Sequence, residues 1–433
     1  MKIRVFHAAE GDCLLVTSRD GRTLLVDGGM SHSFRAHAAP FLGQMRRAGE
    51  HLDVVCVSHI DGDHISGILR MMDDHVAWVV HRHHLDHGHA THPQPESPEP
   101  PDIGEIWHNA FHEQVGDNAG PIADLYAAMA RLLVYHPDPG QQVLGTSRTD
   151  LAFSQKQAIQ LSRRVGAAQL GIPLNPPSQG RLLFARDDQD PVPLGSASVR
   201  ILGPFEEDLA ALRSEWDAWL DANAKVLREI REAADADERD LAGTGLAAAR
   251  AQLRLAATEL GNRGKVTVPN LASILLLVEE EGRTALLTGD GHGSDVLKGL
   301  ERTGVIEPGG GLHVDVLKVQ HHGSEHNVSE VFAKRITADH YLFCGDGAHH
   351  NPDLAVIDVF LRSRVGKDHE RSDNPEVDRP FRLWFSSSPT ALHIPARATH
   401  MENVRERVRD YQGEHPGRFR YSFLRHSSLE IEI

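Results

Sequence analysis

Long apolar runs and cysteines are scarce in this 433-residue chain. No stretch approaches the roughly 20 consecutive apolar residues that span a bilayer, and residues 1–6 lack the apolar stretch of a signal peptide. Cys13, Cys56 and Cys344 are the only cysteines and lack framework spacing, which argues against disulfides and for a reducing compartment. We therefore expect a cytoplasmic protein without a membrane segment.

The chain also lacks the basic excess of a protein that coats nucleic acid. It has 45 basic and 61 acidic residues and a net charge of −16, which speaks against broad, sequence-independent binding. A buried cleft can still bind a phosphodiester if metal ions supply the positive charge there. Neither a Ser-His-Asp nucleophile elbow nor a phosphate-binding Gly-x-x-x-x-Gly-Lys loop occurs in the sequence.

Four metal-capable side chains lie within six residues in the segment 59–64. They follow a β-branched apolar run, 54–57, that predicts a buried strand, and they precede apolar residues at helical spacing in 65–72. Mixed imidazole and carboxylate ligands suit zinc, manganese or iron, and two adjacent acid–imidazole sets suit two ions. The alternative is a polar loop that contains histidines by chance. The four side chains are His59, Asp61, Asp63 and His64.

Three more predicted strands also end in polar residues. The segment 23–29 runs into Asp-Gly-Gly, 284–290 ends in Gly-Asp, and 315–324 ends in His-His-Gly-Ser. Functional sites of sheet-based folds gather at the carboxyl ends of strands. Together with 59–64, these clusters predict one metal site that is assembled from distant parts of the chain.

The order Asp27-Gly28-Gly29, His59-x-Asp61-x-Asp63-His64, Gly289-Asp290 and His322-Gly323 resembles that of the metallo-β-lactamase superfamily of di-metal hydrolases. Within that superfamily, the chain is similar to the hydrolase domain of DNA-uptake competence channel proteins. That similarity includes the opening 5–13, Asn270 and Ser273 before the Gly-Asp strand, and the motif Leu-Lys-Val-x-His-His-Gly-Ser at 317–324. It covers roughly residues 1–80 and 265–395.

The resemblance implies a four-layer αββα sandwich, an α/β fold with two long, largely helical insertions. We expect the core to comprise 1–81, strands in 181–204, and 265–433 with its C-terminal strands. A His/Pro-rich and helical insertion would occupy 82–180, and a second helical insertion 205–264.

The resemblance also implies roles for individual residues around two divalent ions, zinc or manganese. His59 and Asp61 would hold one ion, Asp63, His64 and His322 the other, and Asp290 would bridge them. The third histidine that the superfamily often adds to the first ion has no evident equivalent. Asp27, Asn270, Ser273 and His321 would support the ligands. Asp63, Ser324, His349 and His350 would act on the substrate.

The function implied is metal-dependent hydrolysis by a metal-bound hydroxide. The competence-type motifs favour a phosphodiesterase or nuclease, with nucleic acid or a small phosphodiester as substrate. The alternatives are a thioester or lactam hydrolase, and a binding or regulatory component with little turnover. The amphipathic spacing within 205–264 is compatible with a cover for the site, with a contact for a regulatory protein, or with a packed structural arm.

Other expectations concern local structure. We expect strands at 2–7, 12–18, 23–27, 53–58, 76–81, 182–184 and 198–202, helices at 34–49 and 65–72, and terminal strands at 381–394. The segment 82–102 has loop composition, and its histidine tract (His83, His84, His87, His89, His92) is either solvated or metal-binding. His108 and His112, four residues apart, would share one helix face.

Overall fold

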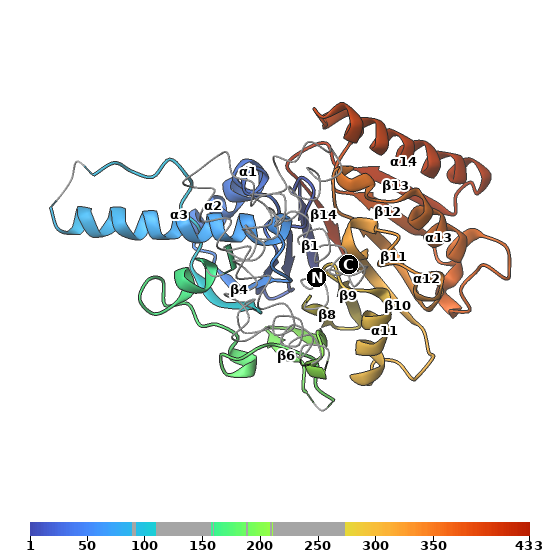
Figure 1. The fold of residues 1–433 in the computed structure, drawn as a ribbon, viewed down its shortest axis with the longest axis horizontal. Coiled ribbons are helices and arrows are strands. Elements are labelled where there is room, and N and C mark those ends of the chain that lie inside the picture. Colours follow the sequence, from blue (N-terminus) through green and yellow to red (C-terminus); the bar gives the residue numbers. More distant parts are fainter. Residues whose placement is uncertain (89–91, 110–156, 159, 188, 208–209, 211–272) are drawn as a thin grey trace, which may run out of the picture.

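The computed structural model describes every residue except 89–91, 110–156, 159, 188, 208–209 and 211–272, and within the described residues it contains two β-sheets (Figure 1). The first sheet has six strands. Its order is β14 (Ser428–Glu432), β1 (Lys2–Phe6), β2 (Leu14–Thr17), β3 (Thr23–Val26), β4 (Leu52–Val57) and β5 (Ile103–His108).

The second sheet has eight strands, of which β9 to β13 run parallel to one another, while β8 is antiparallel to β9. Their carboxyl ends therefore lie along one edge of the sheet, where loops can bring side chains together. The order is β13 (Phe419–Phe423), β12 (Phe381–Phe385), β11 (Ile336–Phe343), β10 (Leu312–Lys318), β9 (Arg283–Leu287), β8 (Leu275–Glu280), β7 (Ala197–Gly203) and β6 (Val192–Leu194).

Helices cover the outer face of each sheet, so the four-layer αββα prediction is confirmed. Alternation along β4 shows why the layers form: Val54 and Cys56 point into the core between the sheets, and Val55 and Val57 point toward the helices. The first sheet is covered by α1 (Ser31–Ser33), the π-helical η1 (Phe34–Ala38), α2 (Ala39–Arg47) and α3 (Gly62–Asp86). The second is covered by α11 (Gly293–Arg302), α12 (Glu330–Arg335), α13 (Leu354–Val365) and α14 (Pro395–Glu414).

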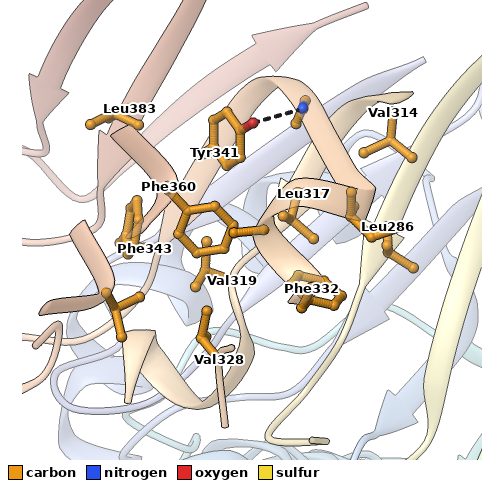
Figure 2. Packing of buried hydrophobic residues seen from close by; sticks show 14 of the residues in the cluster. Leu286, Val314, Leu317, Val319, Val328, Phe332, Tyr341, Phe343, Phe360 and Leu383 are labelled. Carbon is orange, nitrogen blue, oxygen red and sulfur yellow. Dashed lines mark hydrogen bonds between the residues drawn. The ribbon is translucent and has the colours of Figure 1, made fainter. Parts of the chain in front are cut away.

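The outer core of the second sheet is rich in aromatic side chains (Figure 2). The ring of Phe360 on α13 lies 5.2 Å from that of Tyr341 and 6.0 Å from that of Phe343, both on β11. It also meets Phe332 of α12 edge-on at 6.5 Å. These contacts fix α12 and α13 against β11, which is paired with β10 in the same sheet.

The expected strand at 76–81 and the start of the expected loop at 82–102 are wrong, because α3 continues for 25 residues to Asp86. Valines at 76, 79 and 80 suggested a strand, but neither glycine nor proline interrupts the helix between Gly67 and Gly88. Packing of the following segment supports the extension, since Trp78 Nε1 donates to Ser97 O at 3.0 Å. Figure 1 shows this helix reaching away from the two sheets.

Three other expectations also differ from the structure. His108 ends the strand β5 and does not share a helix face with His112, which is outside the described residues. Residues 182–184 form no strand, because Leu183 N–H bonds to the side chain of Asn109 instead of a neighbouring strand. Strand β12 ends at Phe385, and the 20-residue helix α14 precedes the last two strands.

The central part of the first expected insertion, 110–156, and nearly all of the second lie outside the described residues. Among the helices in the part of the chain that the structure covers, none combines the length and apolarity that crossing a bilayer requires. Short 3-10 turns complete the elements: η3 (Pro176–Ser178), η4 (Gln320–Gly323), η5 (Ala348–His350), η6 (Pro375–Asp378) and η7 (Pro389–Ala391).

Candidate metal centre

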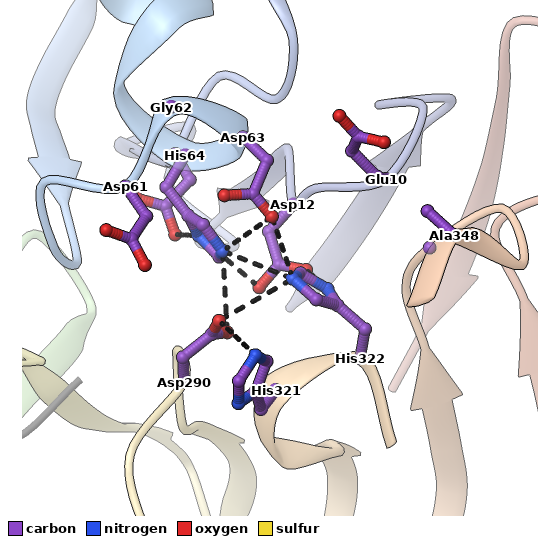
Figure 3. A network of polar contacts seen from close by, with 12 residues as sticks. Glu10, Asp12, Asp61, Gly62, Asp63, His64, Asp290, His321, His322 and Ala348 are labelled. Atoms are coloured by element: carbon purple, nitrogen blue, oxygen red, sulfur yellow. Dashed lines mark hydrogen bonds and ion pairs between the residues drawn. The ribbon is translucent and has the colours of Figure 1, made fainter. Parts of the chain in front are cut away.

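The carboxyl ends of β3, β4, β9 and β10 bring histidines and aspartates together at one edge of the sandwich (Figure 3). Asp27 follows β3, Ser58 and His59 follow β4, Asp290 lies three residues after β9, and His322 lies four residues after β10. The structure thus gathers the strand-end clusters of the sequence into one site.

The first turn of α3 supplies Asp63 and His64, and the residue before the helix is Asp61. Carboxylates are favourable here because the helix N-terminus carries partial positive charge. The first turn of α3 packs closely against two other backbone segments. A Cβ on Gly67 would lie 2.1 Å from Gly28 O, and a Cβ on Gly11 would lie 1.7 Å from Asp63 O. Only glycine permits these backbone contacts.

His321 and His322 adopt left-handed backbone conformations, with φ of 44° and 55°. Such angles are costly for residues with a Cβ and persist where the surroundings hold them. His321 N–H donates to Gly289 O at 3.1 Å, and Ser324 N–H donates to His321 O at 2.9 Å. These bonds aim both imidazoles at Asp290.

Four imidazole Nε2 atoms surround the carboxylate of Asp290. His64 Nε2 lies 3.4 Å from Oδ1. Oδ2 has three neighbours at 3.6 Å, the Nε2 atoms of His59, His321 and His322. Most of these separations are too long for hydrogen bonds. Two ligands about 2.1 Å from a tetrahedral ion lie about 3.4 Å apart, so the spacing fits side chains that share an ion.

Two buried polar atoms in the centre support this fit. His59 Nε2 and Asp290 Oδ1 have no hydrogen-bond partner among the described residues. A buried polar atom without a partner is costly, and a metal ion would satisfy both. Asp12, His64, Asp290 and His322 each offer one ligand atom, and these atoms all lie within 4.8 Å of one another. The donor set therefore suits a divalent cation.

A partner orients each imidazole through its other ring nitrogen. His64 Nδ1 is placed to donate to Asp27 Oδ2 at 2.9 Å. His321 Nδ1 lies 2.8 Å from Asn327 Oδ1, within hydrogen-bond distance. His322 Nδ1 lies 3.2 Å from Asp12 Oδ1, a contact that is an ion pair rather than a hydrogen bond. Such partners fix the tautomer and leave Nε2 to bind metal.

His59 is oriented in the same way, but through a hydroxyl group. Its Nδ1 lies 3.0 Å from Ser58 Oγ. That hydroxyl donates to Asp27 Oδ2 at 2.6 Å, and the Ser58 backbone N–H donates to Asp27 Oδ1 at 2.7 Å. Asp27 therefore supports both His59 and His64, the role that the resemblance implies for it.

The pKa values reflect crowded negative charge. Burial, together with the neighbouring carboxylates Asp63 and Asp290, raises the pKa of Asp61 to about 7. Burial alone would lower the pKa of His322, but Asp290 and Asp12 raise it to about 10. Burial and the nearby His64 lower the pKa of His59 to about 3, which keeps it neutral as a ligand must be.

Other predicted site residues lie at varying distances from this centre. Ser273 is buried beside the loop of Gly289, and Asn270 is outside the described residues. Ser324 is buried and its Oγ accepts from His326 N–H at 3.4 Å. His349 and His350 are exposed in η5, which follows β11, and the ring of His350 meets that of His400 at 5.4 Å.

Sequence patterns assigned no role to Ser58 and Asn327, which orient two imidazoles of the centre, nor to two of its charged residues. Asp12 follows β1 in the loop to β2 and is 1% exposed, and Lys318 ends β10 and is also 1% exposed. Their side chains form an ion pair inside the site. Asp12 stands after a glycine within the competence-type opening, a signal that could have identified it. Lys318 likewise stands in the motif at 317–324, but its burial could not be read from the surrounding residues.

Comparison with known proteins agrees with this architecture. A search of curated proteins found no match. The family model of the metallo-beta-lactamase superfamily matches residues 9–146. That range contains Asp12, Asp27 and the segment 59–64, while Asp290 and His322 lie beyond it. The specific similarity to competence channel proteins stays a prediction. Over residues 9–146 the chain thus carries a domain similar to the metallo-beta-lactamase superfamily of metal-dependent hydrolases, within a matching α/β sandwich.

Proposed function

We propose that this protein is a phosphodiesterase, most favourably a nuclease, that works with two divalent ions, zinc or manganese. The observation that supports this proposal is the position of Asp290 among two acid–imidazole groups. His59 lies near Asp61, His64 and His322 lie near Asp63, and the Nε2 atoms of all three histidines lie within 3.6 Å of the Asp290 carboxylate. One carboxylate between two such groups can bridge two ions.

His321 is proposed as a further ligand of the first ion. Its Nε2 is as far from Asp290 Oδ2 as that of His59, 3.6 Å. This placement would supply the histidine that the sequence motifs leave without an equivalent. Each ion would then have two imidazoles, one carboxylate of its own, and the shared Asp290. The side chain of His321 is 31% exposed, so the first ion would lie nearer to solvent and substrate.

The carboxylate content of the centre supports a phosphoryl substrate. Asp61 occupies a position where a histidine would make a softer site, and oxygen ligands favour harder ions such as manganese. Harder ions suit the anionic oxygens of a phosphodiester. When bound, two ions would supply Lewis acidity and a water acidic enough to attack at neutral pH.

Other residues would orient the metal ligands or donate a proton to the substrate. Asp27 and Ser58 hold His59 and His64 in place, and Asn327 holds His321. His349 and His350, exposed after β11, are the candidates for donating a proton to the leaving oxygen. A regulatory protein acting on 205–264 remains a proposal that rests on sequence alone.

The test is a hydrolysis assay of protein freed of metal and then reloaded with zinc or manganese. The substrates are bis(p-nitrophenyl) phosphate, single- and double-stranded DNA, RNA, a thioester and a β-lactam. We expect metal-dependent turnover of phosphodiesters that chelation removes. Turnover of only the thioester or lactam would contradict the proposal in favour of the other hydrolases. Two bound ions with no turnover of any substrate would favour a binding role.

A further inference from the structure

Lys318 is a lysine whose ammonium group lies inside the metal centre. It is the last residue of β10, yet it is only 1% exposed. Its Nζ forms an ion pair with Asp12, donates to Gly289 O at 2.8 Å, and lies 3.6 Å from Asp290 Oδ1. A buried ammonium is retained only where partners compensate its lost hydration. Lys318 has such partners on two sides of the centre.

Asp12 links Lys318 to one of the imidazoles. The carboxylate of Asp12 meets Lys318 through Oδ2, and Oδ1 lies 3.2 Å from His322 Nδ1. Asp12 therefore lies behind the His322 ring, because the Nε2 of that ring faces Asp63 at 3.1 Å. An aspartate in this position orients the imidazole, and its second oxygen is held in an ion pair with the lysine.

The second contact of Lys318 reaches the bridging carboxylate. Gly289 O, which accepts from Nζ, belongs to the residue before Asp290, and Gly289 has φ of 46°. Thr288 Oγ1 donates to Lys318 O at 2.7 Å, which ties the same turn to the end of β10. The Lys318 ammonium thus contacts both the Gly289–Asp290 turn and Asp12, the carboxylate next to His322.

The charge of the centre gives this ammonium a further effect. With neutral histidines, as metal ligands require, five carboxylates and one ammonium leave four negative charges. Two divalent cations would neutralise them. Without Lys318 the count would be five, and Asp12 would remain as a buried charge with no cationic partner in the described part of the chain. The five carboxylates are Asp12, Asp27, Asp61, Asp63 and Asp290.

We propose that Lys318 is a positioning residue, a fixed cation that holds Asp12 against His322 and the Gly289–Asp290 turn in place, and so sets the affinity for the ion on the His322 side. The proposal rests on the two-ion function above. His322 and Asp63 belong to that side, whereas His59 and His321 do not contact Lys318 or Asp12 through any described ion pair or hydrogen bond. Loss of the ammonium therefore weakens one ion more than the other.

The experiment compares metal binding of the wild type with that of Lys318→Met and Asp12→Asn. Each metal-free protein is titrated with Mn²⁺ and with Zn²⁺, with calorimetry and elemental analysis as readouts and thermal unfolding as a check on folding. We expect two equivalents in the wild type. In both variants one equivalent should weaken about 10- to 100-fold, the usual cost of losing a residue that orients a ligand. Asp12→Asn is nearly isosteric and keeps the test valid if Lys318→Met does not fold.

Arg364→Met is the matched control. Arg364 is a second fully buried cation, bound to Ala338 O and Tyr341 on the far side of β11. Its loss should lower the free energy of unfolding and leave both metal affinities unchanged. Wild-type affinities in Lys318→Met and Asp12→Asn would overturn the positioning role while the two-ion function stands. An equal loss of affinity in Arg364→Met would reduce the effect to stability. Fewer than two equivalents in the wild type would contradict the proposed function itself.

Discussion

Asp27 and His64 meet at the back of the metal centre, where Asp27 Oδ2 accepts a hydrogen bond from His64 Nδ1 at 2.9 Å. Both side chains are fully buried. The same carboxylate accepts from the hydroxyl and the backbone N–H of Ser58. It thereby joins the ends of β3 and β4 to the first turn of α3, and these elements present most of the ligands.

Asp27→Asn should weaken metal binding about 10- to 100-fold, because one amide cannot accept from all three donors and His64 loses its fixed orientation. Metal titration followed by calorimetry measures the effect. Asp53→Asn is the control. Asp53 accepts from Thr23 N–H at 2.8 Å at the opposite end of β3 and β4, so its loss should leave metal affinity unchanged. Equal metal affinity in the two variants would contradict the role assigned to Asp27.

Asp290→Asn should lower turnover by at least about 10²-fold, a typical cost of removing one charged or polar group that acts on the transition state. The amide loses the negative charge that would bridge two ions. Elemental analysis should show fewer bound ions, and circular dichroism should show an unchanged fold. Wild-type turnover in a folded Asp290→Asn protein would remove Asp290 from the mechanism.

Replacement of His349 and His350 by alanine, one at a time, should identify the proton donor. Loss of the donor should lower kcat by about 10²- to 10⁴-fold on DNA, whose leaving alkoxide needs a proton. Turnover of bis(p-nitrophenyl) phosphate should change little, because nitrophenolate leaves without one. Equal losses on both substrates would instead indicate a role in binding.

Phe360→Ala should lower the free energy of unfolding by about 3–5 kcal/mol, because it leaves a cavity among the aromatic rings of α12, α13 and β11. Denaturant unfolding of the metal-free protein measures this change. Val331→Ala is the control on the neighbouring helix α12. Val331 is 61% exposed, so its change should stay within about 0.5 kcal/mol. A similar decrease in the free energy of unfolding in both variants would show that the buried packing of Phe360 is not the cause.

Asp339 should make stability depend on pH at the acidic end. Burial would raise the pKa of Asp339, but hydrogen bonds from His313 and Arg379 hold it at about 2. The ionised form therefore stabilises the fold at pH values above the usual pKa of about 3.8, and this contribution is lost as pH falls toward 2. After discounting for solvent screening, it should be about 1 kcal/mol.

The measurement is thermal unfolding between pH 5 and pH 2 for the wild type and for Asp339→Asn. The variant should be less stable at pH 5, and the difference should shrink as the pH falls. A difference that stays constant over this range would show that the charge of Asp339 is not responsible.

Much of the fold was predictable from local patterns. A β-branched apolar run identified β4, and glycines after Asp27 and before Asp290 marked the ends of β3 and β9. The segment 76–86 was predicted wrongly because three valines favour a strand in isolation. Contacts with 92–101, including His75 Nε2 donating to Pro101 O at 2.9 Å, support the helix there. Such contacts between distant segments leave no local periodic signal.

The sequence alone predicted a metal site, because histidines and aspartates cluster after several strands and together form a ligand set that suits divalent ions. Only the tertiary structure decided how they are arranged. The left-handed turn that aims His321 at Asp290 depends on a hydrogen bond to Gly289, and the burial of Lys318 depends on Asp12, 306 positions earlier in the chain. Both are contacts between segments far apart in the sequence. The first forms when β9 and β10 pair within the second sheet, and the second forms only when the two sheets pack together, so no local pattern of residues encodes them.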